Sequence, residues 1–244
     1  TLQNLEEEIL SSISRATGSS ELISTRIAIE LRKDIKRHLQ ETYLFEADRL
    51  VRDYDKVVNE FLKEFGSLKI PDKFKSLTKI DLETITALKY QSFSGFEDLA
   101  NKYLTEISGN VYQNAIAGRP FREMIKDIRA KITGEVDVRG SSMSRYAGQI
   151  AHDSIMQFDG QFTIHKAKSS GLKYFKYTGT LVTDSRPFCQ THVGRTYSEK
   201  EIRSIWSSNW AGKSSGDPFI VRGGYRCRHT WLPVDKDWDI SDII

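Results

Sequence analysis

Two short pairs of cysteine and histidine are the residues of this chain best suited to chemistry. Cys189 and His192 are separated by two residues, and Cys227 and His229 by one. Zinc commonly takes four Cys or His ligands in a tetrahedron, and two short pairs that the fold brings together are its usual arrangement. The spacing therefore predicts a Zn²⁺ site formed by these four side chains, with Asp184 as a substitute ligand.

The second pair also fits interpretations without a metal. On a strand, Cys227 and His229 share one face but lie roughly 6–7 Å apart, so they need a bulge to reach one ion. Cys227 is equally suited to be a buried apolar residue with His229 as its hydrogen-bonded partner. A Cys189–Cys227 disulfide is a further alternative, although two cysteines are too few for a disulfide scaffold and favour a reducing compartment.

The same residues would also suit acid–base catalysis. His192 and His229 would exchange protons while Arg186 or Arg228 stabilises a phosphate, as in metal-free ribonucleases. The sequence contains no P-loop, dinucleotide fingerprint or metalloprotease helix motif. We therefore expect no catalytic residues and no enzyme activity, and we keep cleavage of nucleic acid by a toxin-like enzyme as the alternative.

A third interpretation gives these residues an architectural role. Asp184 held between guanidinium groups such as Arg186 and Arg228 would fasten a loop to a strand through bidentate hydrogen bonds. The Gly223-Gly224 pair allows a sharp turn or a close approach of the backbone to another segment. Aromatic side chains would then fill the small core, and the candidates are Trp206, Trp210, Tyr225 and Trp231.

Basic charge is concentrated around these motifs. The chain has 36 basic and 33 acidic residues, yet residues 171–234 hold ten basic and four acidic ones, a net charge of +6. A basic domain suits an anionic partner, and we expect Lys213, Arg222 and Arg226 to face nucleic acid. A solvated basic surface is the alternative, and a free DNA-binding module would show salt-sensitive binding.

The elements that must position these residues are mostly helical up to about residue 170. Residues 21–65 contain no proline or glycine, and their apolar residues recur at steps of three and four. This pattern predicts one long helix or two helices broken near residues 41–44. Gly95 is a place where the next helix could bend. Further helices are expected over 81–106, 109–118, 120–132 and 141–170.

Beyond residue 170 the pattern changes to short strands. The aromatic, partly alternating segment 172–178 is typical of a strand, and 219–221 and 227–234 are further candidates. A helix over 199–210, capped by Ser198, is expected between them. The sequence thus predicts an α+β fold in which a long, mostly helical N-terminal region precedes a small mixed α/β domain.

We divide the chain into a helical docking region, residues 1–140, and a C-terminal domain, residues 141–244. The C-terminal domain consists of a connecting helix (141–170), the basic α+β domain (171–234) and an acidic tail (235–244). No apolar run approaches the roughly 20 residues of a membrane span, so we expect no membrane partner.

The C-terminal motifs resemble the tailed-phage minor head proteins, the family of phage Mu F-like head-morphogenesis proteins. The resemblance covers residues 145–234, whereas the first 140 residues are similar only to the family's generic helical region. Several positions match at specific spacings, which is stronger than the match of any one pair. The matching residues are Asp184, Arg186, Cys189, Gly194, Gly223, Gly224, Cys227, Arg228, His229, Trp231 and Pro233.

This resemblance implies structural work in virion assembly. Family members associate with the portal vertex, enter the head in few copies and affect DNA packaging or ejection. The implied partners are the portal protein, capsid and scaffold proteins and packaged DNA, with several copies per portal ring. The implied location is the head interior or portal vertex, after assembly in the bacterial host cytoplasm. Many relatives have Cys or a non-ligand where this chain has His192 and His229, so a family metal site is not carried over.

Overall fold

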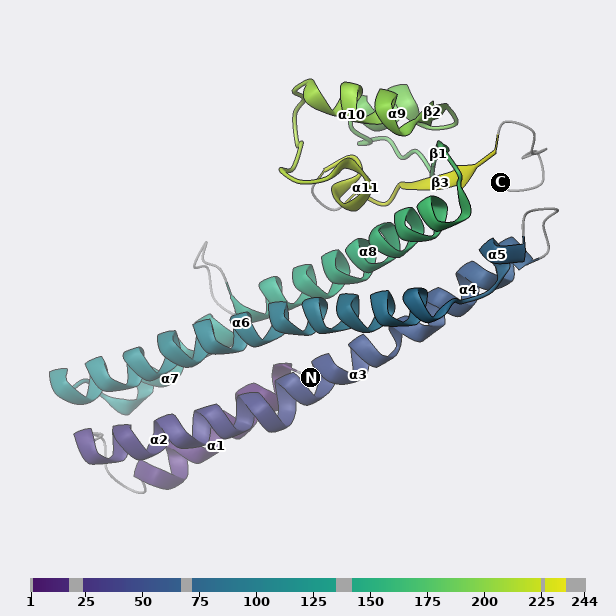
Figure 1. Cartoon of the computed structure of the whole chain (residues 1–244). Coiled ribbons are helices and arrows are strands. Elements are labelled where there is room, and N and C mark those ends of the chain that lie inside the picture. The colour runs from purple at the N-terminus through teal and green to yellow at the C-terminus, as the bar shows by residue number, and fades with distance from the viewer. Residues whose placement is uncertain (1, 18–23, 67–71, 135–141, 225–226, 236–244) are drawn as a thin grey trace. The chain divides into compact units, whose positions relative to one another are not determined.

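The computed structural model describes residues 2–17, 24–66, 72–134, 142–224 and 227–235. The predicted α+β class is confirmed, because long helices precede a small three-stranded sheet with short helices (Figure 1). The chain forms two compact units, one built from Thr1–Arg52 with Gln91–Ala151 and the other from Asp53–Tyr90 with His152–Ile244. No helix of the described residues is long and apolar enough to cross a membrane.

The first unit is entirely helical in its described part. Its core consists of apolar side chains at helical spacing, such as Leu31 and Ile35 on one helix and Ile9 and Ile13 on another, all essentially buried. Its elements are α1 (Leu2–Thr17), α2 (Thr25–His38), η1 (Leu39–Leu44), α3 (Phe45–Arg52), the second part of α6 (Lys79–Ala117), α7 (Phe121–Ile132) and the start of α8 (Met143–Ser170).

The break expected near residues 41–44 is a turn of π-helix. η1 covers Leu39–Leu44, and the flanking residues His38 and Phe45 both keep helical backbone angles. The helix therefore changes its hydrogen-bond pattern without ending. Leu39 and Tyr43 of this π-helical turn are both buried.

One expectation about the central helices was wrong. α6 is a single helix of 39 residues and runs through Gly109, where we expected a new helix to begin. A glycine inside a helix costs only about 1 kcal/mol relative to alanine. Burial of Ile107 and Val111 on either side of Gly109 outweighs that cost.

The helical part of the second unit has an aromatic core. It contains α4 (Tyr54–Gly66), α5 (Asp72–Lys75), the start of α6 and the rest of α8. Phe61 and Phe65 pack on Phe74 with ring centroids 5.3 and 4.7 Å apart, and Phe61 also meets Phe162 of α8 at 5.2 Å. Such offset aromatic contacts fix α4 and α5 against α8.

The C-terminal part of this unit holds the Cys and His motifs. Its elements are β1 (Tyr174–Thr178), α9 (Pro187–His192), β2 (Thr196–Ser198), α10 (Glu199–Ser207), α11 (Pro218–Val221) and β3 (Thr230–Val234). The strands form an antiparallel sheet in the order β2-β1-β3, with Tyr177 opposite Trp231 and Phe175 opposite Tyr197. α8 approaches α11 closely at Gly160, where any Cβ would lie 2.3 Å from the carbonyl oxygen of Phe219.

Most of the expected elements of this domain are confirmed, and one is wrong. The strand predicted over 172–178 is β1, and Ser198 caps α10 through a capping box with Glu201. The strand predicted over 219–221 is instead the short helix α11. Asp217 accepts a hydrogen bond from the Phe219 amide at 3.0 Å and Pro218 occupies the first turn, which is a helix start.

Two other differences concern strand ends. β3 begins only at Thr230, so Cys227 and His229 precede the strand that was expected to carry them. β2 is a three-residue strand that the sequence analysis did not assign as an element of its own. The loop around residues 135–141 and most of the acidic tail lie outside the described residues.

Candidate metal centre

Tyr177, Cys189, Cys227 and His229 come together in the interior of the C-terminal domain. Each is buried, with at most 5% of the residue exposed. Tyr177 lies on the central strand β1, Cys189 in α9, and Cys227 and His229 in the segment that leads into β3. Cys189 of the first motif and both residues of the second therefore meet beside Tyr177 of the central strand.

Local structure explains how the second motif reaches this position. Gly224 has φ +107°, a left-handed conformation that favours glycine, and its Cβ would lie 2.0 Å from the carbonyl oxygen of Gly212. The Gly224 carbonyl then accepts a hydrogen bond from the Cys227 amide at 3.1 Å. This turn directs Cys227 inward, as expected of the Gly223-Gly224 pair.

The distances between the donor atoms suit a tetrahedral metal ion. The Sγ atoms of Cys189 and Cys227 are 3.9 Å apart, and Cys227 Sγ lies 3.5 Å from His229 Nδ1. Zinc bonds of ~2.3 Å to sulfur and ~2.0 Å to nitrogen place two sulfurs about 3.8 Å apart and sulfur and nitrogen about 3.5 Å apart. The three donor atoms all lie within 4.8 Å of one another, so this group could hold a metal ion.

The backbone of Gly223 faces the same cluster. A Cβ added there would lie 2.7 Å from Cys189 Sγ, 2.7 Å from the Tyr177 hydroxyl and 2.8 Å from Cys227 Sγ. Three donor atoms thus surround one small space that any side chain at position 223 would fill. The cluster depends on glycine at this position.

The surroundings of the two cysteines shift their pKa values in opposite directions. Hydrogen bonds from Cys189, His229 and Tyr177 lower the pKa of Cys227, against the opposing effect of burial. The same contact between the two sulfurs, together with burial, raises the pKa of Cys189. The thiolate is the form of cysteine that binds metals. The contacts within the cluster therefore favour the thiolate at Cys227 more than at Cys189.

A disulfide between the two cysteines is not formed. Both are free, and their sulfurs are 3.9 Å apart, far beyond the ~2.05 Å of a bond. Cys227 and His229 do contact each other, as the interpretation of a buried core pair also expects. The Nε2 atom of His229 is buried without a hydrogen-bond partner among the described residues.

His192 and Asp184 do not belong to the cluster, which corrects the predicted ligand set. Nδ1 of His192 lies 2.7 Å from the Tyr197 hydroxyl, and its ring packs on Phe188 with centroids 4.5 Å apart. These contacts hold the imidazole beside β2, where burial and Arg195 lower its pKa. Asp184 is exposed in the loop before α9. Neither joins the group of potential ligands among the described residues.

The prediction that Arg222 faces nucleic acid was wrong. Its side chain is buried, with 4% of the residue exposed, and its backbone has φ +54°. Burial lowers the pKa of its guanidinium, whereas the nearby Asp159, Cys227 and Tyr177 favour its charged form. Its Nε and Nη1 atoms have no hydrogen-bond partner among the described residues. The charge of Arg222 therefore acts inside the domain, close to the cluster.

The other basic residues proposed for nucleic acid give little support. The Lys213 ammonium donates to the carbonyls of Trp206 and Ser208 and lies 4.9 Å from the centre of the Trp210 ring. The ammonium group of Lys213 is therefore already bound by neighbouring residues of the same domain. Arg226 lies outside the described residues.

The remaining motif residues have architectural contacts. Trp231 is buried and donates a hydrogen bond from Nε1 to the Pro218 carbonyl at 3.1 Å. Gly194 has φ +84° and its amide donates to the Tyr177 carbonyl at 2.8 Å, which joins the end of α9 to β1. Arg228 is exposed, and Arg186 lies close to Gly212, where a Cβ would meet its Nε at 2.5 Å.

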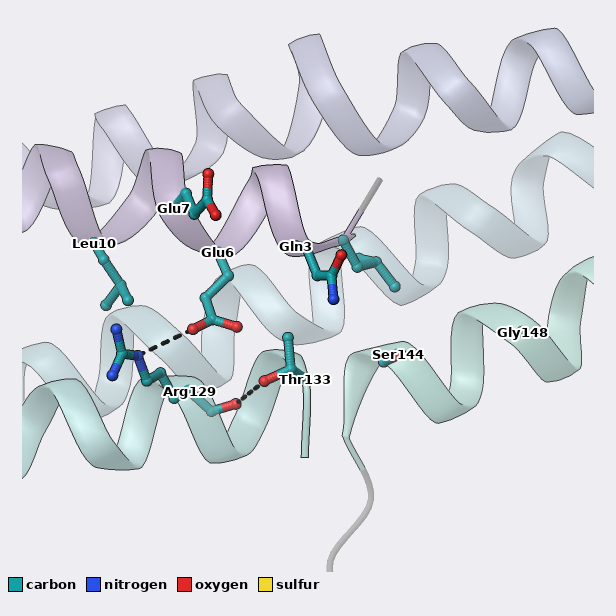
Figure 2. Close-up of a pocket in the computed structure, with 9 residues that line it drawn as sticks. Gln3, Glu6, Glu7, Leu10, Arg129, Thr133, Ser144 and Gly148 are labelled. Atoms are coloured by element: carbon teal, nitrogen blue, oxygen red, sulfur yellow. Dashed lines mark hydrogen bonds and ion pairs between the residues drawn. The ribbon is translucent and has the colours of Figure 1, made fainter. Parts of the chain in front are cut away.

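A separate hollow of about 1100 Å³ lies in the first unit, between α1, α7 and the start of α8. Figure 2 shows Arg129 of α7 reaching toward Glu6 of α1, with which it forms an ion pair at 3.1 Å. Thr133 bonds back to the carbonyl of Arg129 at 3.1 Å. The described residues that line this hollow include no Cys or His, so it is the weaker candidate for chemistry.

Comparisons with family models, with curated proteins and with solved structures found no match to this chain. The resemblance to the Mu F-like family therefore remains a prediction from the sequence. Sequence reasoning missed Tyr177 as a member of the cluster. The available signal was its position in an aromatic strand, but the pairing of Tyr177 with residues 12 and 50 positions later is a property of the fold.

Proposed function

We propose that this protein is a structural minor head protein of a tailed phage or prophage. In this role it associates with the portal vertex and acts in head assembly, DNA packaging or ejection. The proposal rests on the pattern of residues 145–234, which resembles the Mu F-like family. Its partners are then the portal protein, capsid and scaffold proteins and packaged DNA, and its place is the virion.

One observation supports this proposal most strongly. The two halves of the family-like pattern are far apart in the sequence, yet Cys189 of the first half and Cys227 of the second lie 3.9 Å apart in one buried cluster. Gly223, another residue of the pattern, faces the same cluster. Residues that belong to one pattern and also meet in space are what a single structural module would require.

The helical units support docking, and the cluster gives little support to catalysis. Long helices offer extended surfaces that suit assembly on a ring of subunits. The nuclease alternative needs His192 and His229 to act on one phosphate, yet His229 is 5% exposed and His192 is held at Tyr197, outside the cluster. Burial of this kind suits a structural centre better than an acid–base pair.

Removing the gene from the phage or prophage that encodes this sequence tests the proposal. We expect particles to be made in which assembly stalls or DNA packaging and ejection fail, and a plasmid copy should restore infectivity. A Cys227→Ser copy, which disturbs the domain's centre, should restore it poorly, whereas a Lys200→Ala copy, altered at an exposed helix position, should restore it fully. Unchanged infectivity after deletion would contradict the proposal.

A cleavage assay decides between this role and the alternative. Purified protein incubated with DNA and RNA should leave both intact. Degradation that is lost in His192→Ala and His229→Ala variants would instead establish the nuclease alternative.

A further inference from the structure

We infer that Tyr177 completes the Cys189, Cys227 and His229 group as a fourth ligand, so that the four side chains form a closed, structural site for a zinc ion. The three Cys and His donors were candidates from the sequence, but the tyrosine was not. This inference concerns the isolated chain and does not depend on the proposed role in the virion.

The position of the Tyr177 hydroxyl is the first argument. It lies 3.3 Å from Cys227 Sγ and 3.6 Å from Cys189 Sγ. An oxygen ligand at ~2.0–2.2 Å from zinc would lie about 3.6 Å from each sulfur of a tetrahedral centre. The hydroxyl therefore occupies the place of a ligand, next to both sulfurs, and the Gly223 backbone leaves the space between these atoms open.

The ring of Tyr177 is held firmly in this orientation. It is completely buried, stacks on the His229 ring with centroids 5.4 Å apart, and contacts Trp231 at 4.4 Å and Phe188 at 5.7 Å. Its backbone is fixed by the central strand, opposite Trp231 in β3. A ligand that packing has already positioned loses little conformational freedom when the ion binds.

Charge is the second argument. A Zn²⁺ ion with two thiolates, one phenolate and a neutral imidazole has a net charge of −1, and its formation releases the protons of the ligands to solvent. Arg222 supplies the compensating positive charge close to Cys227 and Tyr177. The buried guanidinium also has Asp159 near it, and its Nε and Nη1 have no hydrogen-bond partner among the described residues.

Closure of the site sets its role. Catalytic zinc sites use three protein ligands and keep a position for water or substrate, whereas structural sites use four. All four donors here belong to buried residues that join β1, α9 and the segment before β3. The ion would therefore fasten the central strand to both motifs and would activate no water.

Metal analysis of the full chain tests the inference. Zinc content is measured by elemental mass spectrometry after growth with added zinc, for wild type, Cys227→Ser, Tyr177→Phe and Tyr197→Phe. The last variant is the matched control, because Tyr197 lies in β2 of the same sheet and its hydroxyl contacts His192 instead of the cluster. Metal-free protein is also titrated with Co²⁺, whose thiolate charge-transfer and visible bands report the coordinating atoms.

We expect about one zinc per chain in wild type and in Tyr197→Phe, and none in Cys227→Ser. Tyr177→Phe should lose at least as much zinc affinity as proteins that lose an outer-shell partner of a metal ligand, which is a loss of roughly 10- to 100-fold. Its cobalt spectrum should also change. Wild type without zinc and without a cobalt–thiolate band would overturn the site. Equal affinity and identical cobalt spectra for Tyr177→Phe and wild type would overturn the role of Tyr177.

A measurement on the wild-type chain covers the case in which Tyr177→Phe does not fold. Addition of zinc to the metal-free protein should produce the ultraviolet difference spectrum of a tyrosinate. Zinc binding without that signal would overturn the assignment of Tyr177 as a ligand.

Discussion

Replacement of Gly223 by alanine is the sharpest structural test of the cluster. The new Cβ would lie 2.7–2.8 Å from Cys189 Sγ, the Tyr177 hydroxyl and Cys227 Sγ. Ordinary contacts to carbon are about 3.5–4.0 Å, so three buried atoms must each move by roughly 1 Å. None of them belongs to a flexible exposed side chain. We expect Gly223→Ala to lower the free energy of unfolding by an amount near the upper end of the ~1–3 kcal/mol typical of overpacking.

Chemical denaturation of the whole chain measures this effect. Gly66→Ala is the matched control, because Gly66 ends α4 in the same compact unit and a Cβ there meets nothing within 4 Å. We expect Gly66→Ala to change the free energy of unfolding by less than about 1 kcal/mol. With zinc present, the difference in unfolding free energy between wild type and Gly223→Ala should grow, because the variant also loses the ion. Equal stability of Gly223→Ala and wild type would refute the close approach of Gly223 to the donor atoms.

Two further predictions concern the second unit. Asp81 is fully buried, and its carboxylate oxygens lie 2.9 Å from Lys166 Nζ and 2.7 Å from His165 Nε2. Burial opposes the charge of this carboxylate. Hydrogen bonds from Thr78, Lys166 and His165 outweigh that effect and lower its pKa from 3.8 to about 2. A lowered carboxyl pKa stabilises the fold above pH ~4, so about 2 kcal/mol should be lost as the pH falls from 4 toward 2, and acid denaturation of Asp81→Asn should lack that dependence. Ser198→Ala removes the capping box of α10 and should cost ~1 kcal/mol in thermal or chemical unfolding, whereas Ser204→Ala, exposed inside the same helix, should be close to neutral.

Local patterns in the sequence predicted the helices and the fold class well. The spacing of apolar residues in 21–65 gives α2, α3 and α4, because each of these helices buries apolar residues at helical spacing. The weight given to Gly109 was too large, since burial of its neighbours keeps α6 continuous. The Asp217-Pro218 signal for a helix start was visible in the sequence, but the apolar run after it was interpreted as a strand.

The site was only partly predictable, for a physical reason. The sequence identified Cys189, Cys227 and His229, since their types and spacing suit a metal. It could not show that His192 turns to Tyr197, because the direction of a side chain after a six-residue helix depends on tertiary contacts. Arg222 has a positive φ after α11 and is buried, and no local pattern of charge reveals either property.

The most direct test of the proposed function is quantitative mass spectrometry of purified phage heads. Particles from the phage or prophage that encodes this sequence are separated on density gradients into DNA-filled heads, empty heads and soluble protein. We predict that the chain is found in filled heads in a fixed, small ratio to the portal protein, and that it remains after high-salt washing. Its absence from heads, with the protein recovered only in the soluble fraction, would contradict the proposed role.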